Sequence, residues 1–170
     1  ITMQKGPEYF VEAASRVLMK ADNVRFVMAG NGDMMDKMIR LAASRNISDR
    51  FHFTGFMKGK QVYEILRASD VYVMPSVSEP FGISPLEAMQ CGVPSIISKQ
   101  SGCAEILDYA IKVDYWDIEA LADAMYGLIT YPTLHTFLRD EGLKEVNNIK
   151  WEYAGQKVRK IYDQVLFGKQ

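Results

Sequence analysis

Two carboxylates, Glu79 and Glu87, stand eight positions apart around a glycine turn that leads into a predicted helix. Pro85 is expected at the first position of that helix, where proline is well tolerated. The backbone N–H groups around Gly82 would then lie at a helix N-terminus, which attracts anions. A phosphate held between two carboxylates that accept hydrogen bonds from hydroxyls suits a nucleotide sugar.

The residue type and position of Glu87 allow two interpretations of its role. A carboxylate can accept two hydrogen bonds side by side, which matches the vicinal diol of a ribose, and such charge-assisted bonds are strong. The alternative is an acidic residue that simply stabilises the beginning of a helix.

Helix-like and strand-like segments alternate along most of the chain, which predicts βαβ units. We therefore expect an α/β fold, Rossmann-like and doubly wound, with a parallel sheet covered by helices on both faces. The predicted strands are 24–29, 51–53, 71–74, 95–97 and a weaker 110–113. The predicted helices are 7–20, one capped by Asp33, one ending near residue 68, 85–91 and 118–129, and two more at 134–148 and 151–167. The last helix either packs on this domain's own sheet or reaches a partner domain.

The length of the chain predicts one domain, residues 1–170. The net charge of −1 gives no electrostatic case for binding nucleic acid. No apolar run approaches the roughly 20 residues that a transmembrane helix needs. The two cysteines lack metal-site spacing, and the two histidines stand alone, so no metal site is predicted. We expect a cytoplasmic protein, with peripheral attachment to a membrane left open.

Several motifs in order resemble one family over nearly the whole chain. They are Lys5-Gly6, the segment from Val27 to Gly32, Phe53 to Phe56, Ala68 to Ser76, the run from Glu79 to Pro94, and Ser101 to Glu105. The run with the two glutamates resembles the E-x7-E signature of retaining glycosyltransferases of the GT-B fold, family 4 type (glycosyl transferases group 1). The resemblance implies the C-terminal, donor-binding half of that fold.

The resemblance also implies roles for individual residues. Lys5 matches a lysine that binds the diphosphate of the donor, and Glu79 matches a residue that contacts the donor sugar near the reacting carbon. Phe81, Gly82 and Ile83 would contribute through their backbones. The plain alternatives are a surface lysine, a solvated loop acid and a helix-entry turn.

Gly30 and Gly55 follow predicted strands. Gly30 belongs either to the donor pocket or to a plain turn between a strand and a helix, whereas the segment with Gly55 resembles the one that lines the nucleobase pocket of the family. Phe56 would contact the nucleobase through its backbone, or it would fill the core. Gly30-Asn31-Gly32 lacks the third glycine of a dinucleotide fingerprint, so that assignment is weak.

The resemblance implies a nucleotide diphosphate sugar as donor, transfer with retention, and no cofactor or divalent metal. The absence of any Asp-x-Asp sequence agrees with a metal-free site. The acceptor, whether a glycan, a lipid or a small molecule, would bind an N-terminal domain outside this sequence. We expect the chain to be an excerpt that lacks this domain, a preceding strand ending in Gly-Arg and the arginine that accompanies Lys5. It should show little activity alone.

Two further functions stay open. One is a glucosyltransferase domain similar to starch or glycogen synthase, which shares much of this half of the fold. The other is a nucleotide-binding module without transfer activity, because fold alone does not fix function.

Overall fold

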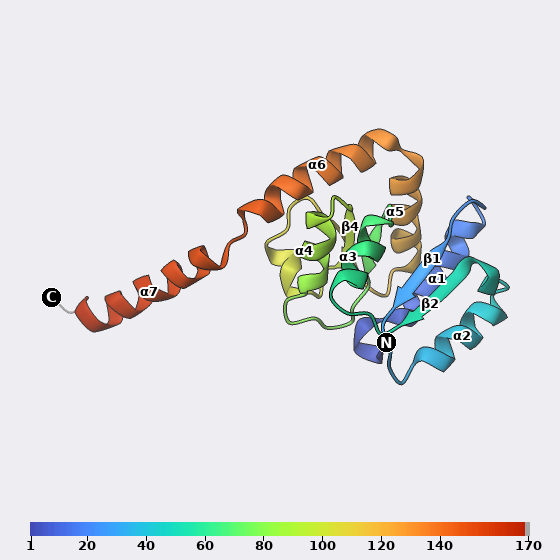
Figure 1. Ribbon diagram of the computed structural model, residues 1–170, viewed down its shortest axis with the longest axis horizontal. Coiled ribbons are helices and arrows are strands. Elements are labelled where there is room, and N and C mark those ends of the chain that lie inside the picture. Colours follow the sequence, from blue (N-terminus) through green and yellow to red (C-terminus); the bar gives the residue numbers. More distant parts are fainter. Residues whose placement is uncertain (169–170) are drawn as a thin grey trace.

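The computed structural model describes residues 1–168 as an α/β fold followed by a projecting helix (Figure 1). Three short 3-10 helices are η1 (Met3–Lys5), η2 (Ser48–Arg50) and η3 (Gly102–Glu105). The strands are β1 (Phe26–Ala29), β2 (Phe51–Gly55), β3 (Tyr72–Met74), β4 (Ser95–Ser98) and β5 (Ile111–Val113). The α-helices are α1 (Pro7–Leu18), α2 (Met35–Ser44), α3 (Lys60–Arg67), α4 (Ile83–Gln90), α5 (Ile118–Thr130), α6 (Pro132–Asn148) and α7 (Trp151–Phe167).

All strand pairs among the described residues are parallel, as predicted, but they form two ladders. β1 pairs with β2, and β3 pairs with β4, which pairs with β5. The connections between these strands contain helices, because parallel neighbours need a crossover.

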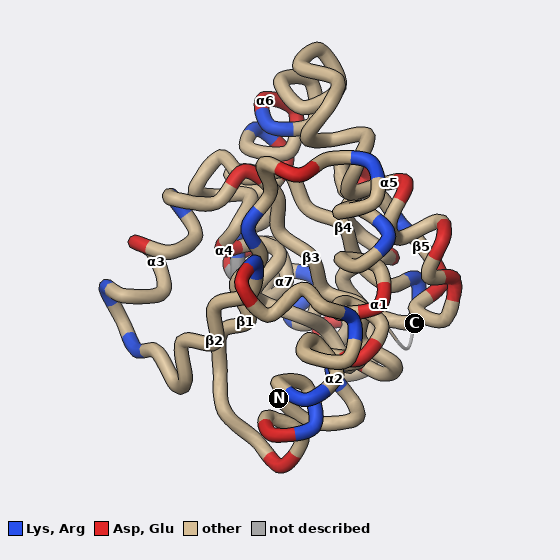
Figure 2. Tube along the Cα trace, turned by 90° about the vertical axis from the view of Figure 1, so that its right-hand side faces the viewer, with Lys and Arg blue, Asp and Glu red and all other residues tan. Residues whose placement is uncertain are grey.

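Helices cover both faces of the strands, which confirms the doubly wound architecture. Ile96 and Ile97 are neighbours on β4, so their side chains point to opposite faces, and both are fully buried. Ile96 packs in a cluster with residues of α1, α2 and α5. Ile97 packs in a second cluster with Met89 of α4 and Val146 of α6. Figure 2 shows basic and acidic positions interspersed along the chain.

Two predicted helix starts were wrong. α4 begins at Ile83, so Pro85 is its third residue, where its missing N–H would have had no partner within the helix. Asp33 does not cap α2, because the backbone already satisfies the first amides of that helix. Met34 N donates to Ile1 O at 3.2 Å, and Met35 N donates to Gly32 O at 3.2 Å.

The C-terminal helix α7 leads away from the body of the domain (Figure 1). Its apolar side chains are exposed, including Val158 at 52%, Ile161 at 59% and Val165 at 70%. The alternative that this helix packs on the domain's own sheet is therefore wrong. Within residues 1–168, no helix is both long enough and apolar enough to cross a bilayer.

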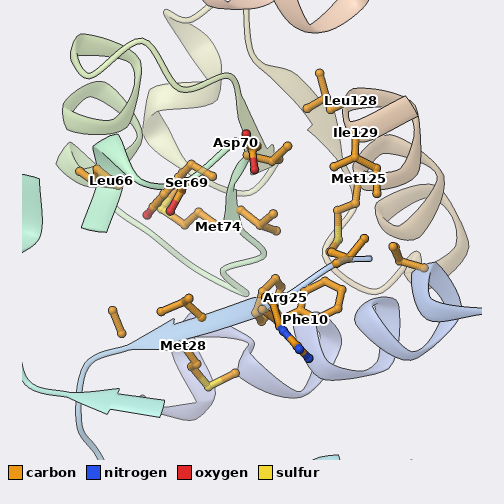
Figure 3. A pocket seen from close by; sticks show the side chains of 18 of the residues that line it. Phe10, Arg25, Met28, Leu66, Ser69, Asp70, Met74, Met125, Leu128 and Ile129 are labelled. Carbon is orange, nitrogen blue, oxygen red and sulfur yellow. The ribbon is translucent and has the colours of Figure 1, made fainter. Parts of the chain in front are cut away.

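A cavity of about 1030 Å³ separates the two ladders. Residues 23–29 line it from the β1 side and residues 68–76 from the β3 side. Figure 3 shows Met28 and Arg25 on one side and Met74 on the other, with Met125 and Leu128 of α5 nearby. No pairing joins β1 to β3 among the described residues, so the sheet is interrupted along this cavity.

Burial of both sheet faces makes a testable prediction for β4. Ile96→Ala and Ile97→Ala should each lower the free energy of unfolding by about 2–5 kcal/mol, because each removes a fully buried side chain. Ile161→Ala on the exposed face of α7 is the matched control and should change it by less than about 0.5 kcal/mol. Urea unfolding measures all three. A small cost at either position 96 or 97 would show that one face of the sheet is open.

Candidate functional site

The predicted site residues gather where the parallel strands end. The loops after β1, β2, β3 and β4 all leave the sheet at the carboxyl edge, where ligands bind in open α/β sheets. The first six residues lie across the same edge. The amino group of Ile1 donates to Asn31 O in the loop after β1, and Val77 N, after β3, donates to Gln4 O at 2.9 Å.

Lys5 and Glu79, the two predicted catalytic residues, meet in an ion pair. Lys5 Nζ donates to Glu79 Oε2, although the residues are 74 positions apart in sequence. The Glu79 side chain is only 13% exposed, whereas that of Lys5 is 51% exposed. A half-exposed ammonium beside a mostly covered carboxylate remains accessible to an anion that arrives from solvent.

Backbone contacts fix Glu79 against the loop after β4. Glu79 forms an isolated parallel bridge with Ser101, and Gly102 N donates to Glu79 O at 2.9 Å. Cys103 N then donates to Phe81 O at 2.7 Å. The carboxylate is therefore held by the sheet edge rather than by a free loop.

Gly6 allows Lys5 to reach this position. Its φ is 60°, a left-handed value that L side chains rarely adopt. A Cβ built on Gly6 would lie 2.1 Å from Pro75 O, so no side chain fits between η1 and the end of β3. This close approach places Lys5 over the loop that carries Glu79.

Gly82 caps the N-terminus of α4 without any side-chain hydrogen bond to the helix amides. A Cβ on Gly82 would meet the side chains of Met74, Cys103 and Glu79 at 3.0–3.2 Å, so the turn packs tightly against the predicted site. Phe81 and Ile83 on either side are 37% and 60% exposed. The first amides of α4 have no partner within the helix and no side-chain cap, and an end of this kind, here next to Glu79, attracts anions.

Glu87 is the fifth residue of α4 and lies just past the first turn of that helix. Its side chain is half-buried, and among the described residues no cation lies within ion-pair distance of its carboxylate. Burial raises the pKa of Tyr72 to about 12, and the charges of Glu87 and Glu79 act in the same direction. Both carboxylates therefore disfavour ionisation of the Tyr72 phenol.

The remaining predicted residues sit at the end of the β1–β2 ladder. Gly30 N donates to Gly55 O at 2.8 Å, which joins the loops after the two strands. Phe56 is 69% exposed, so the alternative that it fills the core is wrong. Lys58 Nζ lies 5.6 Å from the centre of the Phe56 ring.

The structure adds polar groups for which no role was predicted. Tyr72 OH donates to Ser84 Oγ at 2.7 Å, beneath the start of α4. Ser76, just past β3, is fully buried, and its hydroxyl has no partner among the described residues. Only burial distinguishes this serine, and burial is not visible in its local sequence. The described residues contain no group of three potential metal ligands.

A family model relates this chain to known proteins. The model described as glycosyl transferases group 1 matches residues 1–143. The chain belongs to this family. The resemblance stated from the motifs is thereby confirmed.

Curated relatives agree with this membership. An uncharacterized glycosyltransferase of Methanocaldococcus jannaschii is 38% identical over 112 residues, which cover 66% of this chain and 28% of the relative. The 2-deoxystreptamine N-acetyl-D-glucosaminyltransferase of Niallia circulans is 31% identical over 149 residues, which cover 86% of this chain and 38% of that protein. The chain thus spans well under half of the length of these group 1 relatives.

Solved structures show the same fold. The C-terminal domain of a glycosyl transferase group 1 family protein from Francisella tularensis has a TM-score of 0.78 at 26% identity, over 86% of this chain and 80% of that one. Anabaena HepE, in complex with UDP and glucose, has a TM-score of 0.84 at 17% identity, over 96% of this chain and 46% of that one. At that identity the second likeness concerns the fold alone.

The close approach at Gly6 makes a second prediction. Gly6→Ala should destabilise the fold by at least about 2 kcal/mol more than Gly55→Ala, because both residues have a left-handed φ but only Gly6 abuts backbone. A Cβ on Gly55 meets nothing within 4 Å, which makes it the matched control. Thermal and urea unfolding measure the difference. Equal costs would show that η1 is not clamped against the end of β3.

Proposed function

We propose that this chain is the donor-binding domain of a retaining glycosyltransferase that uses a nucleotide diphosphate sugar. The observation that carries the proposal is the Lys5–Glu79 ion pair, which lies at the carboxyl edge of the strands beside the N-terminus of α4, where no side chain bonds the helix amides. A cation, helix amides without a side-chain cap and a nearly covered carboxylate there suit a phosphate joined to a sugar. Membership of the group 1 family supports the reaction class.

Lys5 and the first amides of α4 hold the diphosphate. Negative charge on the diphosphate grows as the bond to the sugar breaks, so these donors stabilise the transition state more than the bound donor. They supply positive charge from the protein itself, and transfer therefore needs no divalent metal. A neighbour in fold, Anabaena HepE, has been solved with UDP-glucose, which supports a nucleotide diphosphate sugar as the class of donor.

Glu79 lies where it can orient the donor sugar. Its hydrogen bond to Lys5 supports a position next to the proposed phosphate, and its backbone is fixed to Ser101 and Gly102. A carboxylate in that place accepts bonds from sugar hydroxyls and stabilises positive charge that develops on the sugar ring.

Glu87 binds the ribose of the nucleotide, and the loops that contain Gly30, Gly55 and Phe56 receive the base. The carboxylate of Glu87 has no protein cation as partner among the described residues, so both of its oxygens can accept bonds from the two ribose hydroxyls. The acceptor binds a part of the full-length protein outside this chain.

Replacing Glu87 tests the ribose assignment. Glu87→Ala should weaken binding of the matching nucleoside diphosphate by about 1.5–3 kcal/mol, the scale for hydrogen bonds to a charged group. Titration calorimetry of the full-length protein with UDP, GDP and ADP in turn measures it. Asp123→Ala, an exposed acid on α5 paired with Lys20, is the control and should leave affinity unchanged. Equal affinity of Glu87→Ala and the parent protein for every nucleotide removes Glu87 from the site.

Glu79 should separate binding from transfer. Glu79→Gln frees Lys5 and removes a negative charge beside the phosphate, so affinity for the free nucleoside diphosphate should rise about fivefold, or about 1 kcal/mol. Sugar transfer by the full-length protein should nevertheless fall by at least about 100-fold if the carboxylate stabilises charge in the transition state. Parallel calorimetry and transfer assays, with and without EDTA, test both statements. Full transfer activity in this variant, or loss of transfer in EDTA, contradicts the proposed site.

A further inference from the structure

The turn into α4 is held by protein contacts on both of its sides. Before the turn, the carbonyl oxygen of Phe81 accepts a hydrogen bond from Cys103 N at 2.7 Å. After the turn, the side-chain oxygen of Ser84 accepts a hydrogen bond from the phenol of Tyr72, also at 2.7 Å. No side chain caps the helix between these two points. The two contacts therefore limit how the first amides of α4 can rotate.

Ser84 matters for anion binding because few amides are available at this helix end. The first N–H groups of a helix have no partner within it. Here the residues in question are Gly82, Ile83, Ser84 and Pro85, and proline has no N–H. Ser84 therefore supplies one of the three backbone donors that this end of α4 can offer to a phosphate.

The phenol of Tyr72 is a well-anchored donor. Tyr72 is the first residue of β3, and its ring packs against two apolar clusters, one that contains Ile97 of β4 and one that contains Ala88 of α4. Contacts with both clusters restrict the rotation of the ring. Burial raises the pKa of Tyr72 to about 12, so the phenol keeps its proton at neutral pH and remains a donor.

Without this phenol, the side chain of Ser84 would keep only a weak contact. Its own hydroxyl donates to Met74 Sδ at 4.0 Å, and a thioether sulfur is a weak acceptor. Removal of the Tyr72 hydroxyl would therefore release Ser84, whereas the apolar contacts of the ring would stay in place.

We propose that Tyr72 is a positioning residue for sugar transfer: through Ser84 it aims the amides at the N-terminus of α4 at the diphosphate of the donor. This inference rests on the proposed function of the site. Tyr72 acts only through Ser84, since its hydroxyl already donates to that side chain. Donors that are aimed in advance need no reorganisation while negative charge grows on the leaving diphosphate, so they lower the barrier to transfer.

Three variants of the full-length protein test the inference: Tyr72→Phe, Ser84→Ala and the two combined. Tyr109→Phe is the matched control, because it removes the hydroxyl of another partly buried ring, which packs against Phe137 of α6. Calorimetry measures the affinity of each protein for whichever of UDP, GDP and ADP the parent protein binds. Competition against that diphosphate measures the affinity for the corresponding nucleoside, and transfer assays give kcat.

Tyr72→Phe and Ser84→Ala should each weaken binding of the nucleoside diphosphate about three- to tenfold, the effect of one neutral hydrogen bond. Affinity for the nucleoside should not change, because the nucleoside has no phosphate to meet the amides. The value of kcat should fall as well, since the amides act most strongly on the transition state. The combined variant should be no weaker than either single variant, because all three lose the same contact. Tyr109→Phe should behave as the parent protein does.

Three results overturn the inference alone, provided that the parent protein binds one of the diphosphates. The first is unchanged diphosphate affinity and kcat in Tyr72→Phe. The second is an equal loss of affinity for diphosphate and nucleoside, which would show a pocket that has loosened as a whole. The third is losses that add in the combined variant, because Tyr72 would then not act through Ser84. A parent protein that binds none of the three diphosphates contradicts the proposed function and this inference together.

Discussion

The parallel direction of the strands is the constraint on which the site depends. Because all the described strand pairs run the same way, the loops after β1, β2, β3 and β4 emerge at one edge. Residues as distant in sequence as Gly55 and Glu79 therefore lie at the same edge of the sheet. Lys5 lies there too, because residues 1–6 cross this edge. An antiparallel neighbour would have carried its loop to the opposite edge, and the Lys5–Glu79 pair could not form.

Backbone hydrogen bonds give the edge its rigidity. Amides from segments remote in sequence donate hydrogen bonds to Gln4 O, Glu79 O and Phe81 O. The close approach of Gly6 to Pro75 leaves no room for a side chain on Gly6. Positioning by main chain costs little entropy on ligand binding, because few rotatable side chains have to be ordered. In the proposed function, the two side chains would only exchange partners: Lys5 would give up Glu79 for a phosphate, and Glu79 would give up Lys5 for a sugar.

The sequence predicted the order and type of nearly every element, since apolar runs of four to six residues alternated with helical periodicity. It also indicated Glu79, Gly82 and Glu87 as candidate site residues, because these three lie within one short run of the sequence. The start of α2 was misplaced because Ile1 O accepts a hydrogen bond from an amide that a local cap was expected to bind. The start of α4 was misplaced because proline is tolerated throughout the first turn of a helix, where its missing N–H has no partner within the helix. Ser76 and the break between β1 and β3 were invisible, because both depend on which strands become neighbours.

The two ladders divide the candidate site between them. Gly30, Gly55 and Phe56 belong to the β1–β2 ladder, whereas Glu79, Gly82 and Glu87 belong to the β3–β4–β5 ladder. A nucleotide that touches both groups must bridge the line along which the sheet is interrupted. Residues 1–6 tie the ladders together at that edge, so the distance between the loops of Gly30 and Gly55 and the carboxylates of Glu79 and Glu87 depends on how firmly β1 and β3 are joined. Whatever fixes this join therefore also fixes the geometry of the proposed donor site.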